Sequence, residues 1–411
     1  MRNFILFIFV NLLAVQVSLL AKDCYVSSDG KSSNLGTLNS PWDLESTLEG
    51  KKKILPGDTI WLLEGTYRYP DRTSKSAGYI VRLGGTRDKP VNILPLPGVR
   101  AVIDGGMTIM FTCQYLYIWN IEILTSENFT MTRIFAAKGS PLPKDYNRPF
   151  VGIALQGSNC KLINLIIHDN GNGIGCGNNS KNSEIYGCII YDNGWKGPDR
   201  GHGHAIYTQN EEGGKVVSDC IMTGGYGWTM HAYTSPNEPA HVDNYLIKNN
   251  ICYNAGEFLV GGANPSHNIT LWHNILYGLD MRVGYSAPYN EDCELKDNLI
   301  INGQLYITGY KKVINENNRI IGKSDKRPDK PQVEIFPNNY DKNRANIVVF
   351  NWTKLPIMQI DLKSFLKTGD EYKFLDPKNF FGEPIASGIY DGNSVSVPVK
   401  GEFTVFVLMK K

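Results

Sequence analysis

A short apolar triplet recurs along the middle of this 411-residue chain, each copy preceded by Asn or Cys and followed by a turn. Successive anchors are 24, 32, 30, 24, 24 and 20 residues apart. β-Branched and aromatic residues alternate between them without a helical period. A period in the twenties with several short strands predicts a parallel β-solenoid, with longer spacings carrying loop insertions. The anchors are Asn164, Cys188, Cys220, Asn250, Asn274, Asn298 and, less cleanly, Asn318.

The anchor residues have a physical explanation. Identical amides on successive rungs, about 4.8 Å apart, can hydrogen-bond along the coil axis. Cys188 and Cys220 fall in the same stack, where two packed thiols are expected and a disulfide is the alternative. Eight cysteines are too sparse for a disulfide scaffold, and we expect buried thiols for most of them. They are Cys24, Cys113, Cys160, Cys176, Cys188, Cys220, Cys252 and Cys293.

The start of the repeat region adds a second pattern. It reads Tyr25-Val-Ser, then Ser40-Pro-Trp, Pro56-Gly-Asp-Thr-Ile and Gly65-Thr-Tyr. Together with the Asn ladder and the rung length, it resembles secreted right-handed parallel β-helix proteins of the pectate-lyase-like superfamily, over roughly residues 23–320. The resemblance implies the fold but no reaction, because that superfamily includes lyases, hydrolases, epimerases and binding proteins. The Lys/Arg patterns of pectate lyases do not stand out, and no subfamily is assigned.

The N-terminus predicts export. A short positive start precedes an apolar run over residues 4–20, and the chain turns polar after Ala21. This pattern is typical of a signal peptide over 1–21, with a membrane anchor as the alternative. We expect an exported protein, located in the periplasm, at the cell surface or outside the cell, with no stable membrane insertion.

The remaining chain divides into three parts. Residues 22–321 are assigned to the β-helix domain, and the polar, proline-bearing segment 322–340 to a linker. Residues 341–411 are expected to form a small antiparallel β-sandwich similar to the C-terminal accessory domains of secreted glycosidases. A structural role is expected for it rather than sugar binding. The strand candidates are Ala345–Trp352, Met358–Leu362, Tyr372–Leu375, Ser394–Val399 and Phe403–Leu408.

The amino-acid composition limits the kinds of molecule that the protein is expected to bind. A formal net charge of +2, with 20% charged residues, gives no basic stripe for a phosphate backbone. We therefore expect no nucleic-acid binding. The expected partner is a polysaccharide, and the protein is expected to be a monomer.

Aligning one strand across the rungs predicts a groove. Two apolar columns are expected in the core: Ile174, Ile206, Met230, Phe258, Met281 and Leu305, and two residues later Cys176, Thr208, Ala232, Val260, Val283 and Ile307. Strand alternation then places a third column outward. That column is Gly175, Tyr207, His231, Leu259, Arg282 and Tyr306, and on one side we expect a further outward column of Gly173, Ala205, Thr229, Glu257, Asp280 and Gln304.

Three side chains of the central column suit β-elimination from a uronic acid. Arg282 would neutralise the carboxylate, His231 would remove the proton at C5, and Tyr207 would protonate the leaving oxygen. His204 is the alternative base, or it orients Tyr207. The main hypothesis is therefore a lyase acting on an acidic polysaccharide.

Hydrolysis is the alternative. Glu257 and Asp280 fall on adjacent rungs, about 4.8 Å apart, which is close to the carboxyl separation of retaining glycosidases. The same pair could instead hold Ca²⁺ or pair with Arg282. A non-catalytic polysaccharide-binding β-helix is the second alternative.

Further residues are expected to bind substrate. The inserted loop over 195–204 would form one wall of the groove. His202 and His204 with Asp199 have no second ligand cluster, so no metal site is predicted there. No cofactor is predicted, and Ca²⁺ remains the open alternative. The substrate-binding candidates are Trp228, Tyr233, Trp195, Tyr306, Gln209 and Arg200.

Overall fold

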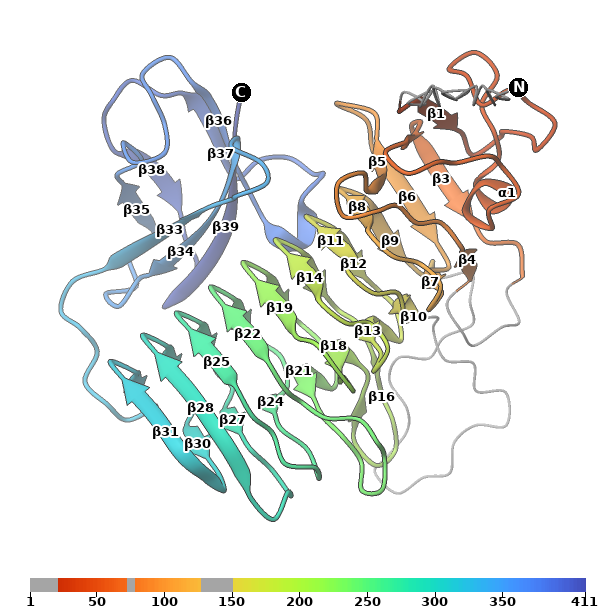
Figure 1. The fold of residues 1–411 in the computed structure, drawn as a ribbon. Coiled ribbons are helices and arrows are strands. Elements are labelled where there is room, and N and C mark those ends of the chain that lie inside the picture. Colours follow the sequence, from red (N-terminus) through yellow and green to blue (C-terminus); the bar gives the residue numbers. More distant parts are fainter. Residues whose placement is uncertain (1–20, 72–77, 127–150) are drawn as a thin grey trace, which may run out of the picture.

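A computed structural model describes residues 21–71, 78–126 and 151–411. Within these residues the chain is almost entirely β, and three long parallel sheets stack rung on rung (Figure 1). The expected parallel β-helix is thus confirmed. The predicted signal peptide, apart from Ala21, lies outside the described residues. No helix in the described part of the chain is long and apolar enough to cross a membrane.

Each rung contributes one strand to each sheet. The eleven-stranded sheet contains β1 (Asp23–Val26), β2 (Thr59–Leu62), β5 (Val91–Pro95), β8 (Leu116–Trp119), β11 (Lys161–Ile163), β14 (Ser183–Tyr186), β19 (Lys215–Ser218), β22 (Tyr245–Lys248), β25 (Ile269–Trp272), β28 (Asn290–Lys296) and β31 (Tyr310–Glu316). The nine-stranded sheet contains β4 (Tyr79–Val81), β7 (Met107–Ile109), β10 (Val151–Leu155), β13 (Asn172–Cys176), β18 (His204–Thr208), β21 (Trp228–Ala232), β24 (Phe258–Val260), β27 (Met281–Val283) and β30 (Leu305–Ile307). The ten-stranded sheet contains β3 (Gly65–Arg68), β6 (Ala101–Asp104), β9 (Glu122–Leu124), β12 (Ile166–His168), β15 (Ile189–Tyr191), β20 (Ile221–Thr223), β23 (Ile251–Tyr253), β26 (Ile275–Tyr277), β29 (Leu299–Ile301) and β32 (Arg319–Ile321).

The predicted register of the nine-stranded sheet agrees with the structure. Ile174 pairs with Ile206, Ile206 with Met230, and the pairing continues to Leu305. These core positions are buried up to Met281, where the stack nears its end. At the other end, the helix α1 (Leu44–Leu48) buries Leu44 and Leu48 in the same core. The side chain of Asp43 caps it by accepting from the Ser46 N–H at 2.7 Å.

The anchor ladder is present, with one correction. Asn250, Asn274 and Asn298 are buried, and each donates its side-chain N–H to the next amide oxygen along the axis at 2.8–3.0 Å. Asn164 is not in this stack, because Ile166 pairs with Ile189 and this register places Leu165 beside Cys188. Asn164 instead occupies the left-handed turn position before the anchor, with φ 55°. Because Asn is favoured at both positions, the sequence pattern assigned Asn164 to the anchor position, which is one residue away from its actual place in the rung.

All eight cysteines are free and buried, as expected for most of them. Cys188 and Cys220 lie on neighbouring rungs, since Ile189 pairs with Ile221. Burial raises the pKa of the Cys220 thiol, and the neighbouring Cys188 adds to this effect.

The C-terminal strands form two antiparallel sheets. All five predicted strands are present, together with β33 and β37, which were not predicted. The five-stranded sheet contains β33 (Gln332–Pro337), β34 (Arg344–Phe350), β39 (Phe403–Lys410), β36 (Glu371–Leu375) and β37 (Ala386–Ile389), and the two-stranded sheet contains β35 (Ile357–Ile360) and β38 (Val395–Pro398). A short 3₁₀ helix, η1 (Pro377–Asn379), follows β36. Strand β33 falls inside the segment 322–340 that was predicted as a linker, and its consecutive residues from Gln332 to Pro337 pair antiparallel with β34.

The C-terminal sheets lie along the outer face of the ten-stranded sheet (Figure 1). A shared apolar cluster joins Ile221, Ile251 and Ile275 of the coil to Val348 and Phe350 of β34. The guanidinium of Arg344 is buried in the contact and donates to the Gly187 carbonyl at 2.8 Å. Burial lowers its pKa. Within the described residues, the C-terminal sheets therefore cover the ten-stranded sheet and not the nine-stranded one.

Candidate active site

The outer face of the nine-stranded sheet brings three predicted residues together. Strands β18 and β21 pair so that Tyr207 lies opposite His231 and His204 lies opposite Trp228. The side chains of His204, Tyr207 and His231 are all partly exposed. Their ring centroids are 4.9–5.5 Å apart. Residues 27 positions apart in the sequence thus form one compact polar cluster.

A chain of hydrogen bonds runs through the two histidines. His204 Nδ1 lies 2.9 Å from the side-chain oxygen of Asn172 on β13. His204 Nε2 lies 3.0 Å from His231 Nδ1. Asn172 was not among the predicted site residues, although the register that pairs Ile174 with Ile206 also places it beside His204.

This chain fixes the tautomer of each neutral imidazole. The Asn172 oxygen only accepts, so His204 must donate its Nδ1–H, which leaves Nε2 as an acceptor. His231 then donates its Nδ1–H to that nitrogen, and its own Nε2 keeps an unshared electron pair. The arrangement can therefore supply a proton acceptor at His231 Nε2.

Aromatic rings hold His231 in place. Trp228 stacks on its imidazole at 4.6 Å and 6°, and Tyr233 stacks at 4.8 Å and 21°. Tyr233 also meets Tyr285 edge to face at 6.0 Å. Trp228 and Tyr233 were predicted to bind substrate; in the structure they contact His231. Stacking of this kind limits the rotation of the imidazole and positions Nε2.

Both histidines favour the neutral form. Burial is the main cause that lowers the pKa of His204 to about 4, and Arg200 and His202 contribute. Burial also lowers the pKa of His231 to about 3, with further contributions from His204 and Arg200. The pKa of Tyr207 is raised, first by burial and then by Glu238 and Tyr233. The cluster thus combines a neutral imidazole with a protonated phenol.

Arg282 lies apart from this cluster. Strand β24 separates it from His231, and the residue between them is the buried Leu259. Arg282 Nε donates to Glu257 Oε2 at 2.7 Å, and its Nη2 lies 3.6 Å from Asp280 Oδ2. The predicted carboxylate pair is therefore an ion-pair cluster with Arg282, which was the alternative interpretation. The guanidinium also covers the exposed ring of Tyr306 at 4.4 Å.

The second outward column was predicted wrongly on its first rungs. Ala205 and Thr229 are buried, and a side chain at Gly173 would meet Ile190 in the core. On each of these strands two consecutive residues are buried, the second and the third. The outward positions are instead those of His204 and Trp228, one residue earlier.

The inserted loop over 195–204 forms a small hairpin beside the cluster. Strands β16 (Trp195–Lys196) and β17 (Gly201–His202) pair antiparallel. Trp195 stacks on His202 at 5.1 Å, and His202 Nε2 lies 2.8 Å from Asp199. Arg200 is exposed, with Asp199 at 3.6 Å. The hairpin thus leaves Arg200 open to a ligand.

Gln209 forms a hydrogen bond through its backbone. Its carbonyl accepts from the buried ammonium of Lys215. Its side-chain oxygen is buried and has no hydrogen-bond partner among the described residues. Its role as a substrate-binding residue stays a prediction.

No described group of three or more His, Cys, Asp or Glu residues is placed to hold a metal ion. Glu257 and Asp280, the predicted alternative for Ca²⁺, already enclose the guanidinium of Arg282. These two carboxylates therefore do not fit a metal ion, and no step of the reaction is assigned to one.

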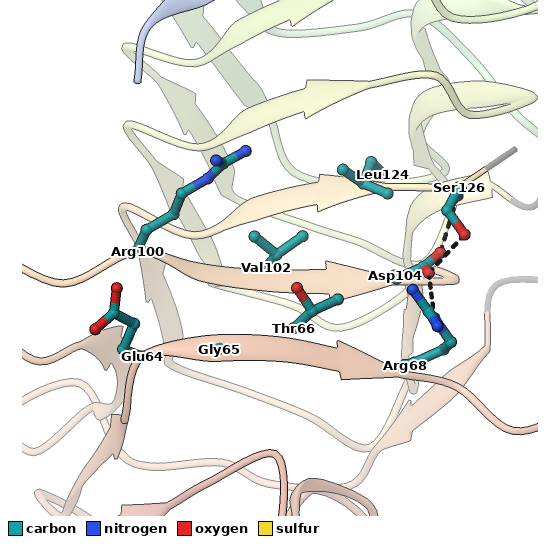
Figure 2. Close-up of a pocket in the computed structure, with 9 residues that line it drawn as sticks. All are labelled: Glu64, Gly65, Thr66, Arg68, Arg100, Val102, Asp104, Leu124 and Ser126. Carbon is teal, nitrogen blue, oxygen red and sulfur yellow. Dashed lines mark hydrogen bonds and ion pairs between the residues drawn. The ribbon is translucent and has the colours of Figure 1, made fainter. Parts of the chain in front are cut away.

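A separate hollow of about 380 Å³ lies on strands β3, β6 and β9 and contains none of the predicted site residues (Figure 2). Arg68 Nε donates to the buried Asp104 at 2.9 Å, and Ser126 meets the same carboxylate. Arg100 is held by Glu122. Both arginines thus have carboxylate partners, and the hollow is a weaker candidate than the histidine cluster.

Comparison with known proteins agrees with this fold. A family model described as "Pel9A-like, right handed beta helix region" matches residues 24–260. The crystal structure of pectate lyase Pel9A aligns with a TM-score of 0.54 and 15% identity, covering 76% of this chain and 80% of that chain. A mannuronic acid specific family 6 polysaccharide lyase from human gut microbiota aligns with a TM-score of 0.41 and 14% identity, covering 68% and 64%.

One curated relative matches in sequence. The pectate disaccharide-lyase of Dickeya chrysanthemi is 29% identical over 110 residues, which are 26% of this chain. The match spans only 12% of that protein's length.

Proposed function

This chain belongs to the Pel9A-like right-handed β-helix family, and on that premise we propose that it cleaves a uronate-containing polysaccharide by β-elimination. Its relatives support a carbohydrate-active enzyme, and two of them are named as pectate lyases. The observation that carries the proposal is the pair of hydrogen-bonded histidines that ends at His231 Nε2.

The base in this proposal is His231. β-Elimination begins when a base removes the proton at C5 of the uronic acid. The tautomer chain from Asn172 leaves the electron pair of His231 at Nε2, and stacking holds the ring. The lowered pKa keeps this nitrogen unprotonated at neutral pH. His204 is the positioning residue that carries the hydrogen bond.

The acid in this proposal is Tyr207. The bond between C4 and its oxygen breaks as the double bond forms, and the leaving oxygen takes a proton. Tyr207 lies beside His231 with ring centroids 5.5 Å apart. Its raised pKa keeps the phenol protonated. The proton taken up by His231 and that lost by Tyr207 balance after exchange with water.

The carboxylate of the sugar needs a cation, and we assign that role to Arg200 rather than to Arg282. Charge that develops at C5 spreads onto the carboxylate, and an arginine can stabilise it through two parallel hydrogen bonds. Arg200 is exposed and close enough to lower the pKa of both histidines. Arg282 is held by Glu257 and Asp280.

Hydrolysis by Glu257 and Asp280 is less well supported. A retaining mechanism needs one carboxylic acid to donate a proton while the other attacks. Both carboxylates lie against the guanidinium of Arg282, so neither is left free to attack a sugar.

A paired assay tests the proposed reaction. The protein is incubated with polygalacturonate, alginate and neutral polymers, with and without Ca²⁺. Ultraviolet absorbance of unsaturated uronates is read beside total reducing ends. We expect both signals to rise together on a uronate polymer. Reducing ends without absorbance would indicate a hydrolase, and binding without either signal would indicate a non-catalytic protein.

Asn172 offers a second test of the tautomer chain. Asn172→Leu is expected to lower kcat about tenfold, because losing a hydrogen bond worth about 1 kcal/mol frees the imidazoles to change tautomer. Asn172→Asp keeps an accepting oxygen and should restore most of the rate. Since a carboxylate favours the protonated imidazole, it should also move the acid limb of the pH profile upward. Equal rates in both variants and the wild type would contradict the role of Asn172.

We also propose that residues 1–21 direct export and are removed, and that the mature protein is a monomer. The division into a β-helix over 22–321, a linker and a C-terminal domain is retained as part of this proposal.

A further inference from the structure

A second groove lies on a different sheet from the histidine cluster: it is built on the eleven-stranded sheet instead of the nine-stranded one. It has a volume of about 900 Å³ and runs between the ends of β22, β25 and β28 and the C-terminal strand β33. It includes Trp272 and His273 from the coil and Glu334 from β33. Its size is in the range of grooves that hold small ligands.

The floor of this groove is a row of three side chains on neighbouring strands. Lys248 pairs with Trp272, and Trp272 pairs with Lys296, so the indole lies between two lysines in one row. Rungs about 4.8 Å apart set the spacing of this row. Trp272 is 40% exposed, which is unusual for so large an apolar ring.

The same row is covered further up the coil. There its aromatic members, Trp119 and Tyr186, are packed edge to face by Tyr340 from the C-terminal domain at 5.4 and 4.8 Å. Tyr340 does not extend over Trp272, where the groove opens. The row is therefore packed against Tyr340 at Trp119 and Tyr186, whereas the indole of Trp272 is exposed.

Lys248, Lys296 and Arg319 line the groove, against the carboxylates of Asp297 and Glu334. Lys248 and Arg319 form no ion pair within the residues that the structure describes, while Lys296 is held by Glu294 at 2.6 Å. His273 lies 3.0 Å from Glu334, which raises its pKa. Two of the cations are thus available to carboxylates of a ligand.

We infer that this groove is a second binding site for a uronate-bearing segment of the polysaccharide. One sugar ring would stack on the indole of Trp272, whose flat apolar face suits it. Lys248 and Arg319 would pair with carboxylates of neighbouring sugars. This inference rests on the proposed function for the class of polymer, and it assigns the groove to retention of the chain, not to its cleavage.

The test is native affinity electrophoresis in gels that contain polygalacturonate, alginate, dextran or single-stranded DNA. His231→Ala is used as the background so that the polymer is not degraded. We expect retardation in a uronate gel but not in dextran or DNA, with Trp272→Ala raising the apparent Kd about tenfold. Lys248→Ala should raise it severalfold, and added salt should reduce the retardation.

A matched control is Phe381→Ala, which removes an aromatic ring of similar exposure, 43%, outside the groove. It should leave retardation unchanged, and thermal melting should show that each variant is folded. Absence of retardation in both uronate gels, equal retardation in dextran or DNA, or unchanged binding by Trp272→Ala would overturn the inference.

Turnover separates this inference from the proposed function. In the active protein, Trp272→Ala should keep its kcat on short oligouronides and raise the KM for the polymer. Retardation that depends on Trp272 without any unsaturated product would uphold the second site and contradict the lyase. Unsaturated product with no such dependence would do the reverse.

Discussion

His231→Ala is expected to lower kcat on the uronate polymer about a thousandfold, because general base catalysis contributes factors of roughly 10² to 10⁴. The change removes Nε2, the only nitrogen of the tautomer chain whose electron pair is left for substrate. Melting temperature at pH 7.5 should fall by only a few degrees, because the ring lies on the outer face of the sheet and loses stacking on Trp228 and Tyr233.

Two further variants make this result specific. Tyr207→Phe keeps the ring but removes the phenolic proton, and we expect a loss of about a hundredfold. His267→Ala removes an exposed histidine whose partner is Asp243, and it should leave kcat unchanged. Full turnover by His231→Ala would exclude it as the base. Loss of folding in this variant would contradict its position on the surface.

The sequence predicted the register of the site well, for a physical reason. A rung must place apolar residues in the core at each repeat, so Ile206 and Met230 could be aligned from the pattern alone. Once they are aligned, strand alternation places Tyr207 and His231 on the outer face. The same alignment could have identified Asn172, since it lies two residues before Ile174. The chain contains many Asn residues, and the sequence around Asn172 does not distinguish it from the others.

Strict alternation fails at the start of these strands. Ala205 and Thr229 are buried next to the core residues that follow them, and His204 lies outward instead. A similar limit applies to Asn164, since Asn suits both the left-handed turn position and the anchor beside it. Period-2 reasoning holds only within the extended part of a strand.

Side-chain partners were the least predictable feature. Arg282 was expected to bind substrate, and in the structure Glu257 and Asp280 hold it. Trp195 was expected to stack on sugar, and it stacks on His202. Column positions show which residues share a face, but pairing depends on rotamers and on the hairpin that brings Arg200 to the cluster. The sequence therefore predicts the composition of a face better than its contacts.

Activity at acidic pH should reveal the unusual environment of His231. An ordinary imidazole with a pKa near 6.5 would be about 1% deprotonated at pH 4.5. With its pKa lowered to about 3, His231 stays largely deprotonated there. We expect kcat/KM at pH 4.5 to remain within about threefold of its plateau, where an ordinary imidazole would lose about a hundredfold. A fall of kcat/KM centred near pH 6.5 would contradict this environment.

A change to a charge beside His231 provides a control for this pH profile of kcat/KM. Beyond burial, His204 and Arg200 both help to lower the pKa of His231, and Tyr207 is the further titratable group beside its ring. Arg200→Met should therefore move the acid limb upward once each variant is normalised to its own plateau. An unmoved limb would place Arg200 too far away to bind the same carboxylate that His231 acts on.

The same pKa shift must also appear in stability. Below pH 6.5 the unfolded chain protonates His231 while the folded chain does not, so the free energy of unfolding falls with pH down to about pH 3. At pH 4.5 this effect is on the order of 2 kcal/mol. His231→Ala lacks it, so the variant should melt below the wild type at pH 7.5 and approach or exceed it at pH 4.5. Ionisable groups that do not contact His231 titrate alike in both proteins, so their effects cancel in the difference, whereas the hydrogen-bonded His204 contributes to it together with His231. A constant difference across this range would show that the two histidines are not held as neutral imidazoles.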